Sequence, residues 1–316
     1  MIDEAAWDAA VSALSSATQV SLACHESPDA DALGSMLAVA LGLRARGVAV
    51  ACGAFPLPLP QRYSFIPGLD LLKETLDRAP SLMVTFDAGS MDRMGPLASY
   101  AKRASSLIVV DHHITNDKFG TIDLVDPMAA ASAVVARELL ARLGIPIDKD
   151  IATCLYAGLV TDTGRFQYAN TTPSVHTLAA ELIACGVEHD KIAQQLFASH
   201  SIGFLKLASL ALARVAIERG VVWSWVGQQD LETAGATLEE AGELIDLIRT
   251  VEDVDVAASL RQQGDGRWLV SMRSRGATDV GAICESLGGG GHRLAAGFRI
   301  AGEPAAIMER IVASQA

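Results

Sequence analysis

The stretch QVSLACHESPDADALGSMLAVALGLRAR, residues 19–46, decides the fold that we expect for this chain. Residues 19–24 have the short apolar pattern of a buried strand, and residues 32–46 have the pattern of a helix. The loop between them carries one histidine and two aspartates, which are His25, Asp29 and Asp31. A strand that leads through a polar loop into a helix is the repeating unit of α/β proteins, which bind ligands at the carboxyl ends of their strands.

The same alternation of strand and helix continues to about residue 185. Further strands are expected at residues 48–54, 82–86 and 107–110. The expected helices lie at residues 69–79, 95–103, 132–143, 149–160, 174–185 and 190–196. The runs LMVTF and LIVV are apolar throughout, as in central strands that are covered on both faces. The pattern therefore predicts an α/β domain with a doubly wound, mostly parallel sheet.

A different pattern follows, and it predicts a second, smaller α+β domain across a cleft from the first. A helix runs to about residue 214 and leads into the strand-like run VVWSWVG. After a helix at residues 238–250, the alternating runs VDVAASLRQ and RWLVSMRS flank the turn QGDG and indicate a hairpin. A helix near residues 279–287, a short strand GFRIAG and a final helix complete this part. We expect a catalytic domain over residues 1–185, a helical linker or hinge over 186–205, and a substrate-binding domain over 206–316.

Composition limits the possible functions. The formal net charge of −12 argues against a broad basic surface for long nucleic acid, although small anionic substrates stay possible. The five cysteines lie in apolar stretches without C-x-x-C spacing, which indicates buried free thiols. The N-terminus lacks the pattern of a signal peptide, and no apolar run has the length of a membrane span. We expect a cytoplasmic protein with no membrane partner.

Four segments carry side chains that suit a divalent metal site at the edge of the sheet. They are the loop with His25, Asp29 and Asp31, then TFDAGSMDRMG with Asp87, DHHITN with Asp111, His112 and His113, and GLVTDTGRF with Asp162. Each alone has a structural alternative, such as a helix cap, a turn residue or a solvated loop histidine. Together, six residues suffice for two cations about 3.5–4 Å apart that share a carboxylate. They are His25, Asp29, Asp31, Asp87, His112 and Asp162.

A fifth segment, in the second domain, suits an anionic ligand. SMRSRG (271–276) and LGGGGHRLAAGF (287–298) combine glycines, whose backbone a ligand can approach closely, with hydrogen-bond donors for a phosphate. The alternative is a flexible turn with a capping glycine. The candidate substrate-binding residues are Arg273, Ser274, Gly289, Gly290, Gly291 and His292.

These five motifs together resemble the DHH/DHHA1 family of phosphoesterases, whose name comes from the run that stands here as Asp111-His112-His113. The resemblance covers nearly the whole chain and is greatest for the oligoribonuclease/pAp phosphatase subgroup, some members of which cleave cyclic di-AMP. It implies two divalent cations, with Mn²⁺ expected and Mg²⁺ or Co²⁺ as alternatives. Asp87 would bridge one cation held by His25 and Asp29 and another held by Asp31, His112 and Asp162.

The resemblance also implies roles for residues beside the metals. Asp111 would orient the histidines, His113 would contact the scissile phosphate and help protonate the leaving oxygen, and the second domain would hold the distal part of the substrate. Arg165 departs from the expected small residue and would contact substrate or a neighbouring carboxylate. A homodimer is expected from the resemblance alone.

The function that follows is hydrolysis of a small nucleotide by in-line attack of a hydroxide that bridges the two cations. Candidate substrates are short oligoribonucleotides and 3'-phosphoadenosine 5'-phosphate (pAp), with cyclic di-AMP or its linear product pApA as an alternative. A catalytically inactive nucleotide-binding regulator is a further alternative, but it predicts the loss of a ligand, and all six are present. An RNA-binding module would need a basic surface with stacking aromatics; Trp223 and Trp225 alternate in one expected strand and suit packing better.

Overall fold

Alternating strands and helices build the first 199 residues in the computed structural model, which describes residues 2–76 and 80–314. Six parallel strands form one sheet in the order β3-β2-β1-β4-β5-β6. Their bounds are β1 Gln19–Cys24, β2 Ala49–Gly53, β3 Leu72–Lys73, β4 Leu82–Phe86, β5 Ser106–Asp111 and β6 Ile122–Val125. The predicted doubly wound parallel sheet is confirmed.

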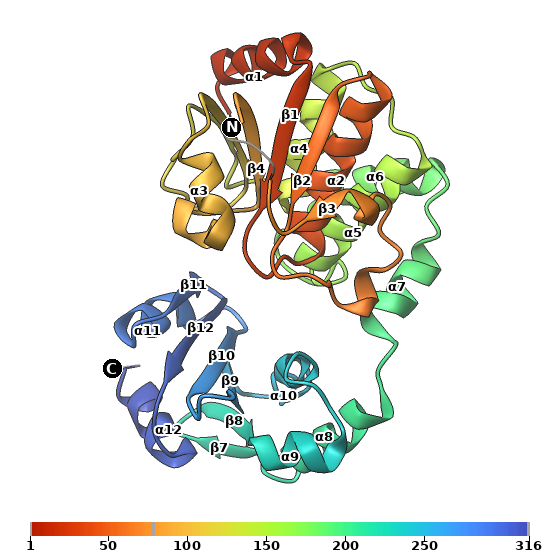
Figure 1. The fold of residues 1–316 in the computed structure, drawn as a ribbon. Helices are drawn as coiled ribbons and strands as arrows, with labels where there is room; N and C mark the ends of the chain where they lie inside the picture. Colours follow the sequence, from red (N-terminus) through yellow and green to blue (C-terminus); the bar gives the residue numbers. More distant parts are fainter. Residues whose placement is uncertain (1, 77–79, 315–316) are drawn as a thin grey trace. The chain divides into compact units, whose positions relative to one another are not determined.

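Helices cover both faces of this sheet (Figure 1). On one face α1 (Glu4–Ser16), α2 (Ala30–Ala45), α4 (Ser132–Arg142) and α5 (Lys149–Asp162) bury a large apolar core. On the other face a 3-10 turn (Met91–Leu97) and the short α3 (Ala98–Ala101) cover a smaller cluster. Helices α6 (Pro173–Ala184) and α7 (His189–Phe197) end this unit. Because β4 and nearly all of α2 are buried, their sequences are mostly apolar and show no regular alternation with polar residues.

Glycines let two of these helices pack at very short range. A Cβ atom on Gly34 of α2 would lie 2.2 Å from the carbonyl oxygen of Cys154 in α5. A Cβ atom on Gly158 of α5 would lie 2.4 Å from the Oδ1 atom of Asp31 in α2. Only glycine fits at both positions, so α5 passes directly over the carboxylate of Asp31.

Three expected helices are wrong or shorter than predicted. Within residues 69–79 the chain makes a 3-10 turn and then β3, which pairs with β2; residues 77–79 lie outside the described part. Within 95–103 only α3 is α-helical, because Gly95 has a positive φ of 54° and Pro96 lacks a backbone donor. Within 238–250 a 3-10 turn (Glu240–Glu243) precedes the short α10 (Leu244–Ile248). Strand β6, helix α1 and the helix α9 (Gln228–Ala234) were not predicted.

The second unit, from residue 200, is α+β as predicted. Its mixed sheet has the order β11-β12-β10-β9-β8-β7, in which only the β8–β9 pair is parallel. The bounds are β7 Ala216–Glu218, β8 Val221–Val226, β9 Val256–Gln262, β10 Trp268–Ser274, β11 Gly290–His292 and β12 Ala295–Ile300. The antiparallel pair β9 and β10 is the expected hairpin.

Two separate apolar clusters lie on the two faces of this second sheet. Helices α11 (Val280–Ser286) and α12 (Pro304–Ala313) cover one face. Helices α8 (Ile202–Leu212), α9 (Gln228–Ala234) and α10 pack on the other. The two units meet in sequence between Ser199 and His200, inside the expected linker; α7 belongs to the first unit and α8 to the second. The hinge role of residues 186–205 stays a prediction.

The five cysteines are free, and all except the half-buried Cys185 are buried. Over the described residues, no helix combines the length and the apolar character that crossing a membrane requires.

Candidate metal centre

The parallel sheet brings the predicted metal-binding segments of the first unit to one edge. Strand β1 ends immediately before His25, β4 before Asp87, and β5 with Asp111. These three strands are neighbours in the order β1-β4-β5, so their carboxyl ends lie side by side. Asp162 joins them from the last residue of α5.

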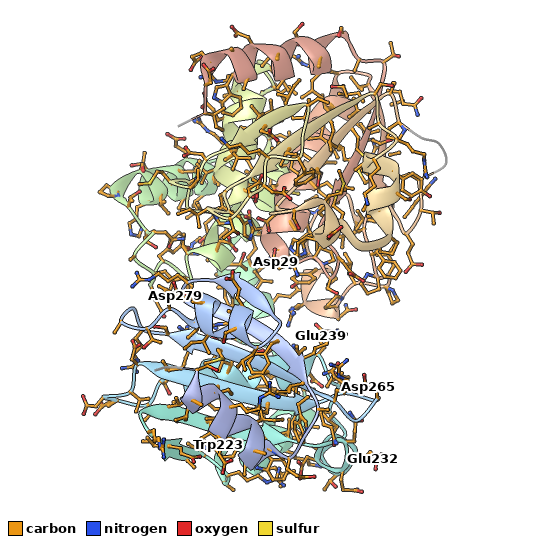
Figure 2. The ribbon with its side chains drawn as sticks, turned by 90° about the vertical axis from the view of Figure 1, so that its left-hand side faces the viewer. Asp29, Trp223, Glu232, Glu239, Asp265 and Asp279 are labelled. Carbon is orange, nitrogen blue, oxygen red and sulfur yellow. The ribbon has the colours of Figure 1, made fainter. Side chains whose placement is uncertain are left out.

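Two groups of three side chains have the spacing of metal ligands. One is His25, Asp29 and Asp87, and the other is Asp31, His112 and Asp162; in each, three ligand atoms lie within 4.8 Å of one another. The Nε2 atom of His25 is 3.6 Å from Oδ2 of Asp87 and 4.0 Å from Oδ1 of Asp29 (Asp29 is labelled in Figure 2). All six residues that the sequence predicted as metal ligands therefore come together.

Asp87 belongs to the first group and also faces the second. Its Oδ2 atom faces His25, while its Oδ1 atom is 3.6 Å from Nε2 of His112, which in turn is 3.1 Å from Oδ2 of Asp162. Asp87 also forms a third group of potential ligands with His112 and His113. A carboxylate with one oxygen toward each group has the arrangement that a bridging ligand requires.

Each of the three histidines is held through its Nδ1 atom. The Nδ1–H of His25 donates to the carbonyl of Glu26 at 2.8 Å, and that of His112 donates to the carbonyl of Ala129 at 3.3 Å. A carbonyl oxygen can only accept, so Nδ1 carries the proton in both rings and Nε2 is the atom that can bind a metal. His113 differs, because its Nδ1 lies 2.7 Å from Oδ1 of the fully buried Asp111.

The N-terminus of α4 holds two of the carboxylates, which the sequence did not predict. The backbone N–H groups of Ser132 and Ala133 donate to Asp31 at 2.6 and 2.9 Å, and the hydroxyl of Ser132 donates to Oδ1 of Asp87 at 2.9 Å. Ser132, Asp31 and Asp87 are all buried. The only hint in the sequence was the start of a helix at Ser132.

Asn116 is a second residue near the site without an expected role. Its side-chain N–H groups donate to Oδ2 of Asp111 at 2.5 Å and to the carbonyl of Ala88 at 3.2 Å. It thereby ties the end of β5 to the residue that follows Asp87. Asp111 contacts His113 on one oxygen and Asn116 on the other. The role in orienting the histidines that the family resemblance implied stays a prediction.

The electrostatics of the site indicate a shortage of positive charge. Burial alone would lower the pKa of His25 and His112, but hydrogen bonds to Asp87 and Asp162 and the charges of nearby carboxylates raise these values to about 9 and about 10. Burial raises the pKa of Asp162 to about 6, and burial also raises that of Asp31. Burial acts in the same way on Asp87, but the histidines lower its pKa. The oxygen and imidazole donors suit hard or borderline divalent cations, so the residues fit such ions.

Each of the four site loops contains a non-glycine residue with positive φ. These are Ser27 (56°), Asp87 (56°), Lys118 (53°), Arg165 (63°) and Phe166 (63°). Such left-handed conformations are uncommon outside glycine and concentrate at functional sites. At Asp87 the conformation turns the chain sharply after β4. Arg165 is exposed, and its guanidinium lies 4.4 Å from the centre of the Phe197 ring. Its contact with substrate or with a carboxylate stays a prediction.

The substrate-binding residues predicted in the second unit lie around β10, β11 and β12. The guanidinium of Arg273 donates to the carbonyl of Met272, and the hydroxyl of Ser274 donates to Asp255 at 3.2 Å. The glycine run is not a free loop: Gly290 and Gly291 belong to β11, and the N–H of Gly289 donates to the carbonyl of Cys284. The side chain of His292 lies outside the described part of the structure. Substrate binding by these residues stays a prediction.

Family comparisons agree with the fold and the site. The model of the DHH family, N-terminal domain, matches residues 19–159, and that of the DHHA1 domain matches residues 220–313. The chain belongs to the DHH/DHHA1 family of phosphoesterases, as the resemblance of its motifs implied.

Individual relatives refine this class. The chain is 35% identical to the bifunctional oligoribonuclease and PAP phosphatase NrnA of Thermus thermophilus, over 89% of this chain and 84% of that protein. It is 29% identical to the cyclic-di-AMP phosphodiesterase GdpP of Geobacillus thermodenitrificans, over 60% of this chain and 29% of that protein. Its fold is similar to the crystal structure of an exopolyphosphatase-related protein from Bacteroides fragilis, with a TM-score of 0.91, 20% identity and coverage of 100% and 96%.

Proposed function

We propose that this protein is a two-metal phosphoesterase that hydrolyses short oligoribonucleotides and pAp. The observation that carries the proposal is the pair of ligand groups, in which Asp87 belongs to the first and also faces the second. The similarity to an oligoribonuclease and PAP phosphatase along most of both chains supports this choice of substrates. Turnover of cyclic di-AMP or pApA is a second candidate, supported by the similarity to a cyclic-di-AMP phosphodiesterase over a shorter part of the chain.

Two cations would be held by the six residues at the sheet edge, with Mn²⁺ as the proposed metal. His25 and Asp29 would bind one, Asp31, His112 and Asp162 the other, and Asp87 both. Bound there, divalent cations would supply a water of lowered pKa as the nucleophile and neutralise charge on the phosphoryl oxygens.

The protein's own side chains have distinct tasks in this scheme. The lowered pKa of Asp87 keeps it an anion, and Ser132 fixes its orientation. His113 is held by Asp111 through Nδ1, which directs its Nε2 to the substrate. Protonated there, it would donate to a phosphoryl oxygen and deliver a proton to the leaving oxygen.

A kinetic panel tests this function. Purified full-length protein, stripped of metal, would be incubated with short oligoribonucleotides, pAp, pApA or cyclic di-AMP, each with Mn²⁺ or Mg²⁺. We expect Mn²⁺-dependent release of mononucleotides from short RNA and of phosphate from pAp. Fast turnover of cyclic di-AMP alone would favour the second candidate. Nucleotide binding without hydrolysis in Mn²⁺ would contradict the proposal and favour an inactive regulator.

A further inference from the structure

Residues 129–133, which lead into α4 and form its first turn, make up what we call the support segment. It contacts the side chains of three proposed ligands of the second cation, which are Asp31, Asp87 and His112. The contacts come from the carbonyl of Ala129, the backbone N–H groups of Ser132 and Ala133, and the hydroxyl of Ser132. One short stretch of chain therefore fixes most of the ligands of one cation.

Asp162, the fourth proposed ligand of that cation, comes from a different element. It is the last residue of α5, and three successive residues with positive φ follow it closely, Gly164 (56°), Arg165 (63°) and Phe166 (63°). This left-handed conformation is unfavourable for arginine and phenylalanine, so the surroundings must hold it in place. The position of Asp162 therefore depends on the contacts that fix the turn at residues 163–170.

Asn170, at the end of this turn, joins Asp162 to the support segment. Its Nδ2 group donates to the carbonyl of Asp162 at 3.0 Å and to the carbonyl of Ala130 at 3.1 Å. Carbonyl oxygens only accept, so the NH₂ end of the amide faces both partners and has one hydrogen for each. The carbonyl of Asp162 is also one of those that the end of a helix leaves without a partner inside the helix. Asn170 thus connects two segments that are distant in sequence.

The spacing between these two segments matters because each holds one member of a close ligand pair. The Oδ2 atom of Asp162 lies 3.1 Å from Nε2 of His112, and the carbonyl of Ala129 accepts from the other nitrogen of that ring. Without the two hydrogen bonds of Asn170, the end of α5 and the support segment can move apart. Asp162 and His112 would then lose the spacing that a shared cation requires.

The proposed ligands of the first cation are held by other contacts. His25 donates to the carbonyl of Glu26, and the Oδ1 atom of Asp29 accepts from backbone N–H groups at the start of α2. Asp87 is common to both sites, but its contact with the support segment comes from Ser132. The two cation sites should therefore respond differently to the loss of Asn170.

We propose that Asn170 is a positioning residue that sets the affinity of the second cation site and leaves the first site unchanged. This inference rests on the proposed function, in which Asp31, Asp87, His112 and Asp162 hold that cation. Residues that orient metal ligands typically change metal affinity by roughly 10- to 100-fold. The expected effect of losing Asn170 is a weakening of this size at one site only.

Variants that keep a single cation site locate the effect. His25→Ala should leave only the second site, and His112→Ala only the first. Asn170→Leu, which has nearly the shape of asparagine but no donor, would be added to each, and Mn²⁺ affinity would be measured by calorimetry on the full-length protein. We expect affinity to fall by roughly 10- to 100-fold in the His25→Ala background and to stay unchanged in the His112→Ala background. Unchanged affinity in the first background, or equal weakening in both, would overturn the inference.

Two further variants separate the lost donor from general damage to the fold. Asn170→Gln keeps the NH₂ group on a longer side chain, so it should weaken the second site less than Asn170→Leu does. Gln167→Leu, at an exposed residue of the same turn, is the matched control and should bind Mn²⁺ as the wild type does. Thermal unfolding in EDTA would verify that each variant is folded. Equal weakening by Asn170→Leu and Gln167→Leu would contradict the role of Asn170.

The Mn²⁺ titrations do not depend on turnover, so they separate this inference from the proposed function. If Asn170→Leu weakens only the second site while the wild type hydrolyses no nucleotide, the inference stands and the proposed function is wrong. If Asn170→Leu hydrolyses pAp with the same dependence on Mn²⁺ concentration as the wild type, the inference is wrong and the proposed function stands.

Discussion

At the site, each histidine uses one ring nitrogen to hold its own position. His25 and His112 donate from Nδ1 to backbone carbonyls, whereas His113 contacts the carboxylate of Asp111. A backbone carbonyl places a proton on Nδ1 and leaves Nε2 for a metal, whereas the carboxylate of Asp111 stabilises the protonated ring of His113. The pKa is raised for all three histidines despite their burial, so they differ in the partner at Nδ1 and not in the direction of the pKa shift. The partner at Nδ1 thus distinguishes the two ligands from the proposed acid.

His113→Gln tests this distinction. We expect turnover to fall by roughly 10²- to 10⁴-fold, the range for loss of a general acid, while the protein binds as much Mn²⁺ as the wild type. Initial rates on pAp and calorimetric Mn²⁺ titration would be measured on one preparation. If Mn²⁺ binding disappears together with activity, His113 is a ligand and its proposed role is wrong.

Ser132→Ala tests the contact that holds Asp87. Loss of the 2.9 Å hydrogen bond should weaken metal affinity or activity by roughly 10- to 100-fold, as is typical for groups that orient a ligand. Ser99→Ala, at an exposed serine, serves as the control. Wild-type Mn²⁺ affinity and activity in Ser132→Ala would show that Asp87 does not need this donor.

The sequence was sufficient to predict the six candidate metal ligands but not the residues that hold them. The ligands lie next to apolar strands in motifs of mixed Asp and His, so their position at a sheet edge follows from the alternation of strands and helices. Ser132 and Asn116 act across long sequence separations, on Asp87 and Ala88 respectively. No local pattern predicts which helix N-terminus meets a given carboxylate.

Among the elements, the pair α2 and α5 positions Asp31 and Asp162. Gly34 and Gly158 both allow the helices to approach, but they differ in what lies opposite. The neighbour of Gly34 is the backbone of Cys154, whereas the neighbour of Gly158 is the carboxylate of Asp31. Substitutions at the two glycines can therefore distinguish the effect of helix packing from the effect of the position of Asp31.

Alanine at each glycine gives a matched pair of variants. Both Gly34→Ala and Gly158→Ala should reduce the free energy of unfolding by about 1–3 kcal/mol through overpacking. Only Gly158→Ala should also weaken Mn²⁺ binding beyond this effect, because its methyl group displaces Asp31. Urea unfolding in EDTA and Mn²⁺ titration of the folded proteins would be compared. Equal Mn²⁺ affinity in the two variants would contradict the positioning role of α5.

The prediction of a helix at residues 69–79 was wrong because strand pairing decides the structure of part of this segment. Its apolar residues suited a helix face, yet Leu72 and Lys73 pair with Cys52 and Gly53 at the edge of the sheet. A two-residue edge strand has too few residues to show alternation, and the hydrogen bonds that decide it come from a distant segment. Strongly apolar elements such as α2 and β4 were predicted correctly because nearly all of their residues are buried.

For the molecule as a whole, the site links stability to pH. The pKa values of about 9 for His25 and about 10 for His112 exceed the roughly 6.5 of an unfolded histidine. Their protons therefore stabilise the folded state fully below about pH 6.5, and this stabilisation is lost as pH rises through 9 and 10. Asp162, with a pKa of about 6, acts in the same direction at lower pH.

The metal-free protein should therefore become less stable as pH rises from about 6.5 to 8.5, whereas saturating Mn²⁺ should reverse this slope. A cation replaces the protons, so its binding is favoured as the ligands lose them. Thermal unfolding in EDTA and in excess Mn²⁺ at several pH values provides the measurement. Parallel pH profiles in the two conditions would show that protons and metal do not compete for this site.

The central claim, that Asp87 joins two cation sites, is tested most directly by the stoichiometry of Mn²⁺ binding in Asp87→Asn. Asparagine tolerates the left-handed backbone at this position and removes only the charge. We predict two Mn²⁺ per wild-type chain, fewer than two in Asp87→Asn, and a loss of hydrolysis greater than roughly 100-fold. Asp92→Asn, at an exposed aspartate five residues later, should keep both ions. Two Mn²⁺ bound with wild-type affinity by Asp87→Asn, together with wild-type hydrolysis, would contradict the claim.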